Sequence, residues 1–321
     1  MLSILRKLQD KLIWSIPAAM LAGFFYGLAL DAAPLSVLIL PLTILMVYPM
    51  MVTLNVRALF THGDARLQLV TQGLNFLMVP AAAWVLGILW FADDPMLRLG
   101  LLLASLLPTS GMTISWTGMA RGNVPAAIKM TVLGLLLGSL LTPVYIHLLM
   151  GASIDIPLAR IFRQIALLVF LPLMLGYATQ RLLTRRYGRE HFHATLKSRF
   201  PPFSTLGVIG VVFVALALQA GAVAGDPALL VRILGALAVL YGFNFLISTW
   251  VGRSLFSRED AVALIYGTVM RNLSIALAIA MSLFYEEGSS VALMIAMAYI
   301  LQVQSAAWYL KWQLRAGPAG G

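Results

Sequence analysis

Residues 265–278 read Ile-Tyr-Gly-Thr-Val-Met-Arg-Asn-Leu-Ser-Ile-Ala-Leu-Ala, which places Arg271 and Asn272 inside a long apolar stretch. An arginine at the centre of a membrane-spanning helix costs about 2.5 kcal/mol or more. A sequence keeps such a charge where the helix is interrupted or where the charge has a function. These two residues therefore mark the part of the chain that the rest of the sequence has to explain.

The composition is that of a membrane protein. Of the 321 residues, 61% are hydrophobic and 11% are charged, whereas soluble domains carry about 25% charged residues. The mean hydropathy is +0.92. The chain has no cysteine, which excludes disulfides, thiolate metal sites and thiol chemistry. The net charge of +10 does not indicate nucleic-acid binding, because the basic residues lie in short loops between apolar segments.

We predict an all-α membrane protein with ten transmembrane helices, since each span needs about 20 mostly apolar residues. No small-residue cleavage site follows the basic N-terminal residues, so we expect the first span to be retained. The ten predicted spans are 13–30, 34–54, 67–91, 96–120, 124–150, 158–180, 202–223, 227–251, 259–285 and 289–312.

The loop charges predict that both termini are cytoplasmic, because basic residues gather on that side of a membrane. The expected inside segments contain Arg6, Lys7, Lys11, Arg57, Arg66, Arg121, Arg181, Arg185, Arg186, Arg189, Lys197, Arg199, Arg253, Arg258, Lys311 and Arg315. The expected outside loops are acidic and contain Asp31, Asp93, Asp94, Asp155, Asp226, Glu286 and Glu287. We expect a multi-pass protein of the bacterial inner (plasma) membrane.

Two halves of the chain resemble each other. Residues 73–77 and 242–246 share the pattern Gly-x-Asn-Phe-Leu, five spans apart. Because five is odd, the second copy enters the membrane from the opposite side, as in the inverted repeats of secondary transporters. The sequence thus predicts two inverted five-helix repeats, 13–150 and 158–312, although chance similarity between apolar helices also produces short echoes.

The next span of each half contains an interruption. Residues 108–115 read Pro-Thr-Ser-Gly-Met-Thr-Ile-Ser, and residues 271–274 read Arg-Asn-Leu-Ser. Proline removes a helix hydrogen bond, and unwound backbone within a membrane is tolerated where it lines a cavity or is buried in protein. Broken helices at matching repeat positions indicate a binding site at the midplane. A simple proline kink in span four is the alternative.

The stretch LLPTSGMTISWTGMARGNVPAAIKMTV, residues 106–132, resembles the bile acid:sodium symporter superfamily. The matching positions are Pro108, Ala120, Arg121, Gly122 and Asn123, and MVYPMMVTLNVRAL with RNLSIALAIA looks closest to its arsenite-permease-like branch. The resemblance implies broken helices 4 and 9 that cross, and alternating access between two parts of one membrane transporter unit, 1–321. The implied panel is 13–54 and 158–223, and the implied core is 67–150 and 227–312.

The departures from this family concern its sodium ligands. In sodium-coupled members a glutamate and a glutamine of helix 9 bind sodium, and these positions align here with Gly267 and Arg271. Hydroxyl positions of helix 5 align near Gly134 and Gly138. The arsenite permeases use a cysteine of helix 4, and this chain has none.

We interpret Arg271 as the centre of a site for an anion. All twelve acidic residues lie in loops or at span ends, so we expect no carboxylate beside it at the midplane. The N-termini of the half-helices add positive potential, and we expect their free N–H groups to face the site. A structural role, in which the guanidinium holds unwound carbonyls, is the alternative.

The predicted substrate-binding residues combine this charge with neutral polar groups. They are Arg271, Asn272, Ser274, Thr109, Ser110, Thr113, Asn75 and Asn244, and Gln302 and Gln304 lie within reach of the same region. Lys129 either reaches the cytoplasmic edge or serves as a coupling residue, because a desolvated lysine gives up its proton readily. We expect no metal site, no cofactor and no catalytic residue, since the chain lacks the usual metalloprotease and serine-hydrolase motifs.

These observations predict a secondary-active transporter of a small anionic solute, with either proton or sodium as the coupling ion. Efflux of a metalloid oxyanion and sodium-coupled symport of an organic anion through neutral oxygen ligands are the alternatives. The expected partners are the solute and the lipid bilayer, and no nucleic acid.

Overall fold

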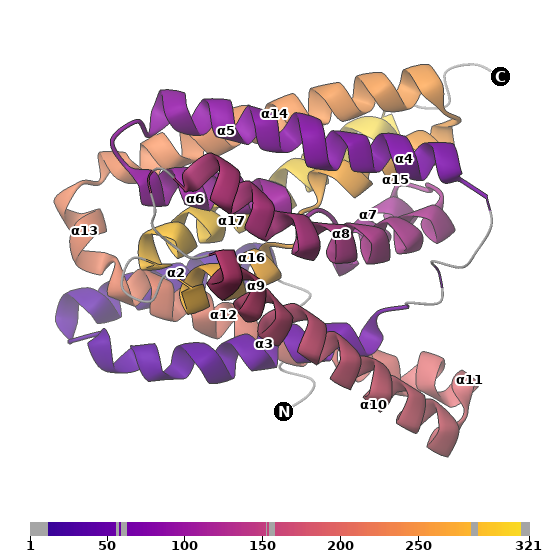
Figure 1. Ribbon diagram of the computed structural model, residues 1–321, viewed down its shortest axis with the longest axis horizontal. Helices are drawn as coiled ribbons and strands as arrows, with labels where there is room; N and C mark the ends of the chain where they lie inside the picture. Colours follow the sequence, from indigo (N-terminus) through magenta and orange to yellow (C-terminus); the bar gives the residue numbers. More distant parts are fainter. Residues whose placement is uncertain are drawn as a thin grey trace. The chain divides into compact units, whose positions relative to one another are not determined.

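The computed structural model describes residues 12–55, 58, 63–151, 153, 158–283 and 288–315. Arg6, Lys7, Lys11, Arg57, Asp155, Glu286 and Glu287, which entered the topology prediction, lie outside these residues. The described chain is helical throughout (Figure 1). Within it, seven helical segments are long and apolar enough to cross a membrane, and three further apolar helices are shorter. The chain is thus an all-helical membrane protein, and the number of ten crossings stays a prediction.

The chain divides into two compact units, and the first comprises residues 1–54, 154–230 and 274–296. Its helical elements are α2 (Leu12–Ala29), η1 (Ala33–Leu38), α3 (Ile39–Thr53), α9 (Leu158–Ile165), η4 (Ala166–Phe170), α10 (Leu171–Tyr187), α11 (Arg189–His191), η5 (Phe192–Leu196), η6 (Lys197–Arg199), α12 (Pro201–Leu218), α13 (Ala220–Gly225), α16 (Leu273–Leu283) and the first part of α17 (Gly288–Arg315).

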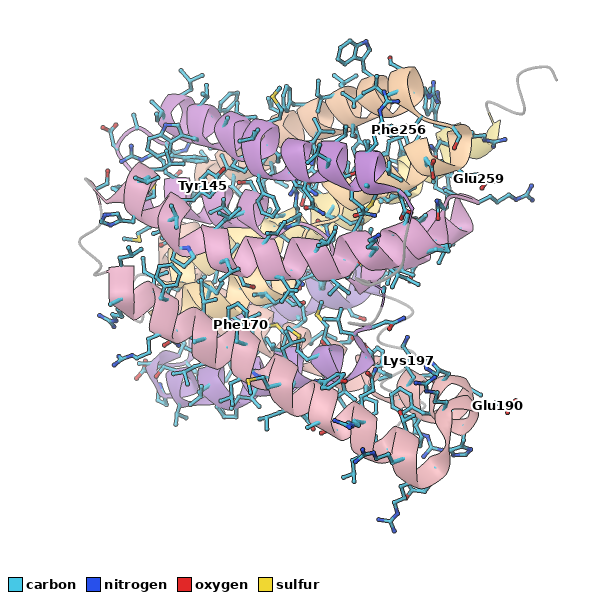
Figure 2. The ribbon with its side chains drawn as sticks, turned by 45° about the vertical axis from the view of Figure 1, so that its right-hand side comes forward. Tyr145, Phe170, Glu190, Lys197, Phe256 and Glu259 are labelled. Carbon is cyan, nitrogen blue, oxygen red and sulfur yellow. The ribbon has the colours of Figure 1, made fainter. Side chains whose placement is uncertain are left out.

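Small residues hold the helices of the first unit close together. A Cβ at Gly23 of α2 would collide with the carbonyl group of Phe213 in α12. A Cβ at Gly207 of α12 would lie 2.7 Å from Cα of Met46 in α3. Membrane helices associate through such close backbone packing, because lipid offers no hydrophobic drive between them. Figure 2 marks Phe170, Glu190 and Lys197 along the η4 to η6 part of this unit.

The second unit comprises residues 55–153, 231–273 and 297–321. Its helical elements are α4 (Ala65–Gly73), η3 (Leu74–Met78), α5 (Val79–Trp90), α6 (Pro95–Leu106), α7 (Gly111–Met119), α8 (Val124–Met150), α14 (Ala228–Leu255), α15 (Arg258–Val269) and the remainder of α17. This unit contains every predicted site residue except Ser274, which belongs to the first unit. The family resemblance places residues 274–296 in the core, whereas the contacts place them in the first unit. The assignment of the chain to a panel and a core stays a prediction.

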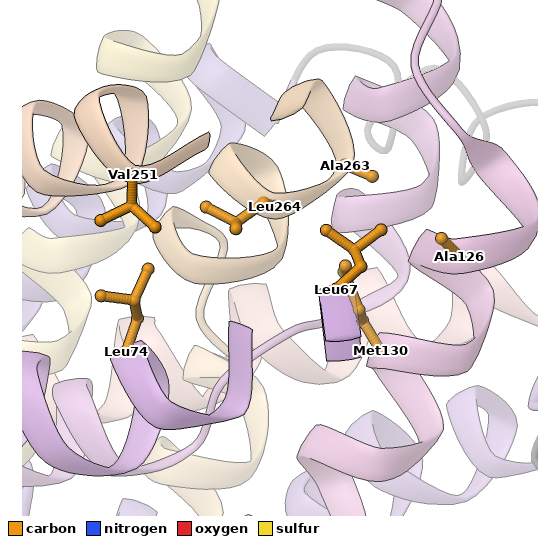
Figure 3. Close-up of a cluster of buried hydrophobic side chains, with 7 residues drawn as sticks. All are labelled: Leu67, Leu74, Ala126, Met130, Val251, Ala263 and Leu264. Atoms are coloured by element: carbon orange, nitrogen blue, oxygen red, sulfur yellow. The ribbon is translucent and has the colours of Figure 1, made fainter. Parts of the chain in front are cut away.

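The core of the second unit packs α15 against α4, α7 and α8. A cluster of buried side chains joins α4, η3, α8 and α15 to α14, and its members are Leu67, Leu74, Ala126, Met130, Val251, Ala263 and Leu264 (Figure 3). Tyr145 of α8, labelled in Figure 2, adds a hydroxyl that donates to the carbonyl of Phe76. Helix α15, which leads into the interruption at Arg271, is therefore held in place on several sides.

The two copies of the Gly-x-Asn-Phe-Leu pattern differ in local structure. The first copy enters a π-helical turn, η3, whereas the second lies within the continuous α-helix α14. A π-turn inserted in a long helix is often found at a functional site. Asn75 lies in this turn and is fully buried.

Candidate functional site

The fourth predicted span is interrupted, as its proline and glycine indicated. Helix α6 ends at Leu106, and α7 begins at Gly111. Thr109 has a φ of 63°, a left-handed conformation that is strained for a β-branched residue. The interruption is shorter than the predicted 108–115, because Ser110 caps α7 and the helix starts at once. Thr113 therefore lies in the first turn of α7 and not in unwound chain.

The ninth predicted span is interrupted at the expected place. Helix α15 ends at Val269, and α16 begins at Leu273. The two interruptions pair with each other as an isolated antiparallel β-bridge between Pro108 and Arg271. The amide of Thr109 donates to the carbonyl of Met270 at 2.7 Å, and the amide of Asn272 donates to the carbonyl of Leu107 at 2.7 Å. Each break thus satisfies backbone groups of the other, as a low-dielectric surrounding requires.

Arg271 is buried at this crossing with an exposed fraction of 2%. Its Nη1 donates to the carbonyl of Ser105 at 3.1 Å. That carbonyl belongs to the last turn of α6, where helix carbonyls lack internal partners and the helix dipole favours a cation. Among the described residues, Nη2 of Arg271 has no hydrogen-bond partner, although it is fully buried. The guanidinium therefore braces α6 with one nitrogen and keeps donor capacity at the other.

No carboxylate in the described part of the chain pairs with Arg271. Its remaining support comes from Gln302 of α17, which is fully buried. The side-chain Oε1 of Gln302 accepts from the backbone amide of Arg271 at 2.7 Å, and its Nε2 donates to the carbonyl of Arg271 at 3.3 Å. The hydroxyl of Tyr241 in α14 also donates to Oε1 of Gln302 at 3.0 Å. Three elements of the unit thus fix the backbone at position 271.

Asn75 and Asn244 both reach the last turn of α15. Nδ2 of Asn75 donates to the carbonyl of Gly267 at 3.0 Å, and Nδ2 of Asn244 donates to the carbonyl of Thr268 at 2.9 Å. These carbonyls are among those that a helix leaves without internal partners at its C-terminus. The side-chain Oδ1 atoms of both asparagines are buried and accept no hydrogen bond from the described residues. Two neutral oxygens therefore accompany the cation of Arg271 in the same unit.

Helix α8 lies against the α6–α7 interruption through two glycines. A Cβ at Gly134 would collide with Oγ1 of Thr109, and a Cβ at Gly138 would lie 3.2 Å from the carbonyl oxygen of Leu106. The hydroxyl of Thr109 donates to the carbonyl of Pro108 at 2.6 Å. The space beside these two glycines is therefore occupied by the hydroxyl of Thr109 and by the backbone of the fourth span.

Ser110 and Thr113 form a reciprocal cap at the start of α7. The amide of Met112 donates to Oγ of Ser110 at 3.2 Å, and the amide of Ser110 donates to Oγ1 of Thr113 at 3.1 Å. The amide of Thr113 donates to the carbonyl of Ser110. The expectation that these N–H groups are free at the break is therefore wrong, because the cap occupies them.

The other predicted residues lie at different places. Asn272 is buried at the crossing with an exposed fraction of 2%. Lys129 lies in the second turn of α8. Its Nζ donates to the carbonyl of Gly63, at 3.3 Å, and Gly63 lies just before α4. This contact favours the alternative in which Lys129 reaches the edge of the unit. Ser274 lies in the first turn of α16, in the other unit. The binding role of each of these residues stays a prediction.

Comparison with known proteins identifies the family. The model of the Sodium Bile acid symporter family matches residues 40–226, more than half of the chain. The chain belongs to this family. It is therefore a multi-pass membrane protein of a transporter family, as the resemblance of residues 106–132 implied.

The names of individual relatives point to different functions or to none. The uncharacterized protein YbaS of Bacillus subtilis is 27% identical over 213 residues, which are 65% of this chain and 67% of YbaS. The arsenical-resistance protein Acr3 of Alkaliphilus metalliredigens is 22% identical over 240 residues, which are 67% of this chain and 66% of Acr3. Sodium/bile acid cotransporter 7 of Mus musculus is 31% identical over 144 residues, 44% of this chain and 40% of that protein. Each match spans at most about two thirds of the relative, so the relatives leave the substrate open.

Two contributors to the site were not predicted. Ser105 acts through its backbone carbonyl, which carries no signal in the sequence. Tyr241 lies three residues before Asn244 and thus on the same face of α14, a spacing that does signal it. Gln302 had been placed within reach of the region, and the structure brings it to the backbone of Arg271.

Proposed function

We propose that this protein is a secondary-active transporter of a small anionic solute. The solute binds beside the crossing of the two interrupted helices, and access alternates between the two sides of the membrane. The observation that carries the proposal is Nη2 of Arg271, a buried donor of a cationic group that has no partner among the described residues. An anion supplies both the missing hydrogen bond and the counter-charge, and hydrogen bonds to charged groups are about twice as strong as neutral ones.

The structural role of Arg271 does not compete with this binding role. Nη1 already holds the carbonyl of Ser105, so the guanidinium is positioned before a ligand arrives. Arginine offers several donors in a fixed fork. A group that is already oriented loses little conformational freedom on binding, which favours affinity. A guanidinium that is held in place through Nη1 and has a free donor at Nη2 is therefore suited to bind an oxyanion or a carboxylate.

Sodium coupling through neutral ligands is the second candidate for the energy source. Oδ1 of Asn75 and Oδ1 of Asn244 are buried acceptors without partners in the described chain. Their Nδ2 atoms bond the carbonyls of two consecutive residues of α15. Neutral amide oxygens of this kind are suitable ligands for a hard cation. Lys129 is the corresponding candidate for proton coupling.

The alternative function, metalloid efflux, is supported by the similarity to Acr3, which is named as an arsenical-resistance protein. The chain has no cysteine, so capture of trivalent arsenic by a thiolate is excluded. An arsenic oxyanion still suits Arg271, because it presents charged oxygens to the guanidinium. Arsenate therefore belongs among the tested anions, with arsenite as the contrasting neutral species.

A thermal-shift screen of the purified protein tests the proposal. Carboxylates, phosphate, arsenate, arsenite and antimonite are added with and without sodium and at several pH values. A ligand present at 100 times its Kd stabilises the folded protein by about 2.7 kcal/mol. We expect an anion to raise the Tm of the natural protein and to lose this effect in Arg271→Gln. Arg98→Gln is the matched control, because Arg98 donates to the hydroxyl of Ser153 and not to the crossing. An anion that stabilises Arg271→Gln as much as the natural protein contradicts the site.

The proposed topology, with ten spans and both termini inside, has its own test. Because the chain has no cysteine, single cysteines introduced at exposed positions outside the predicted spans report the side on which they lie. We expect Asp226→Cys to react with an impermeant thiol reagent added to intact cells and Arg186→Cys to react only after lysis. The opposite pattern would invert the proposed orientation, and reaction of both in intact cells would contradict the count of spans.

A further inference from the structure

A groove with a volume of about 620 Å³ lies between α14 and the C-terminal half of α17, in the second unit. One wall is a single stripe of α14 formed by Gly242, Phe245, Leu246, Thr249, Trp250 and Arg253. These positions follow the spacing i, i+3, i+4, i+7, i+8 and i+11, which places them on one face of the helix. Tyr309 and Trp312 of α17 form the opposite wall. The groove is thus an elongated surface groove along α14 and not an internal packing cavity.

The polar groups inside the groove are already satisfied. The hydroxyls of Thr249 and Tyr309 bond each other at 2.7 Å. The ring of Tyr309 packs against Phe245 with 4.8 Å between centroids. The exposed surface of the groove is almost entirely apolar as a result. Whatever fills its length must therefore be apolar, because a polar occupant would find no hydrogen-bond partner there.

One end of the groove has a different character. The guanidinium of Arg253 lies over the ring of Trp312, 4.9 Å from its centroid. Trp250 and Trp312 are 67% and 49% exposed, and Arg253 is exposed beside Ser254. Tryptophan is enriched at the level of lipid headgroups, and arginine next to it attracts anionic headgroups. This end combines both features in the last turn of α14.

The length of the groove matches one leaflet of a bilayer. Gly242 and Arg253 are eleven positions apart on a continuous α-helix, which corresponds to about 16 Å at 1.5 Å per residue. Half of a hydrocarbon core of about 30 Å is about 15 Å. An acyl chain that begins at the headgroup level beside Arg253 therefore ends close to the membrane midplane beside Gly242.

We propose that this groove binds a phospholipid with an anionic headgroup. The phosphate is held by Arg253 and the hydroxyl of Ser254, and one acyl chain lies along the stripe from Trp250 to Gly242. Under the proposed orientation this end of α14 is cytoplasmic, where anionic lipids are abundant. A second copy of the chain fits the groove less well, because a two-fold interface would bring the same groove from both copies, and its lining contains Arg253 but no carboxylate to pair with it. The inference does not depend on which solute the protein transports.

Gly242 offers a sharp test of the apolar part. A Cβ at this position has no atom within 4 Å, so the side chain of Gly242→Leu starts in open space at the wall of the groove, and leucine also favours the helix. Gly221→Leu is the matched control, because Gly221 of α13 also has open space around its Cβ and lies outside the groove. Native mass spectrometry of the delipidated protein then measures retention of added phosphatidylglycerol and phosphatidylcholine.

We expect the natural protein and Gly221→Leu to retain phosphatidylglycerol and Gly242→Leu to lose it. Arg253→Gln should weaken the binding of phosphatidylglycerol about fivefold, the factor contributed by one basic residue near an anionic surface. It should weaken the binding of phosphatidylcholine less, because the choline group already offsets the charge of that phosphate. Arg258→Gln, in the first turn of α15, should change neither. Glycerol phosphate without acyl chains should not compete.

Four outcomes would overturn the proposal. Equal retention of both lipids by the natural protein shows that the protein does not distinguish lipids by the charge of their headgroups. Retention of phosphatidylglycerol by Gly242→Leu at the natural level shows that the lipid binds elsewhere. Effective competition by glycerol phosphate shows a free-phosphate site, and a dimer that Gly242→Leu dissociates shows that a second copy fills the groove. A Tm of Gly242→Leu equal to that of Gly221→Leu confirms that loss of lipid does not reflect misfolding.

Discussion

Pro108 and Arg271 pair across two interrupted helices in an antiparallel β-bridge, although 162 positions separate them in the sequence. The bridge joins the end of α6 to the end of α15, so the geometry of one break determines that of the other. Gln302 clamps the same point, since it bonds both the amide and the carbonyl of Arg271. The conformation of the candidate site is therefore a property of three helices together.

Gln302→Leu should destabilise the protein strongly. The substitution keeps the volume of the side chain but leaves the backbone amide and carbonyl of Arg271 and the hydroxyl of Tyr241 without this partner. Each buried polar group left unpaired costs about 1–3 kcal/mol. Tyr241→Phe removes only one of the three bonds and should cost less. Thermal unfolding of the detergent-purified variants measures both losses of stability. An equal loss of stability in Gln302→Leu and Tyr241→Phe would show that the bonds of Gln302 to the backbone of Arg271 contribute nothing.

Asn75 and Asn244 should act on the same element. Asn75→Ala and Asn244→Ala each free one terminal carbonyl of α15, and each should cost about 1–3 kcal/mol. Because the two carbonyls belong to consecutive residues, the double variant should depart from additivity. A double-mutant cycle on the free energy of unfolding checks this. Strict additivity would show that the two asparagines support independent parts of the unit.

The strained backbone at Thr109 predicts an unusual order of stabilities. With a φ of 63°, Thr109→Gly should be more stable than Thr109→Ala by about 1 kcal/mol, because both lose the hydroxyl but only glycine relieves the strain. Thr113 lies in the first turn of α7 and provides the control. There the alanine variant should be the more stable by about 0.5–1 kcal/mol. The same order at both positions would contradict the left-handed conformation at Thr109.

Lys129→Gln tests proton coupling. If Lys129 carries the coupled proton, transport of the solute found in the screen should lose its pH dependence in this variant, because glutamine does not titrate. Uptake into proteoliposomes over a range of external pH measures this. Lys311→Gln, at an exposed position of α17, is the control and should keep the natural profile. An unchanged profile in Lys129→Gln would assign the lysine a structural role, as in its contact with the carbonyl of Gly63.

The sequence predicted the place of both breaks because each break has a local cause. Pro108 cannot continue a helix, and Arg271 is too costly for an unbroken one. The lengths of the breaks were not predictable from the same signals. Thr113 and Ser274 lie in helices, and at Thr113 the cause is the cap that Ser110 forms at the start of α7.

The contacts of the site depended on packing, which the sequence does not encode locally. Asn75 and Asn244 were expected at the crossing because polar side chains in a membrane seek partners. That both bond to α15 follows from how α14 and η3 pack. The carbonyl of Ser105 received no prediction, since every residue has one. The expectation of free amides at α7 failed because a serine followed three residues later by a threonine satisfied them.

The close contact between Gly134 and Thr109 constrains which substitutions this protein tolerates. A Cβ at position 134 would have to displace Oγ1 of Thr109. Conversely, Thr109 keeps its present side-chain position only while residue 134 has no side chain. A larger residue at position 134 therefore requires a compensating change at the interruption between α6 and α7, so the two positions are expected to vary together.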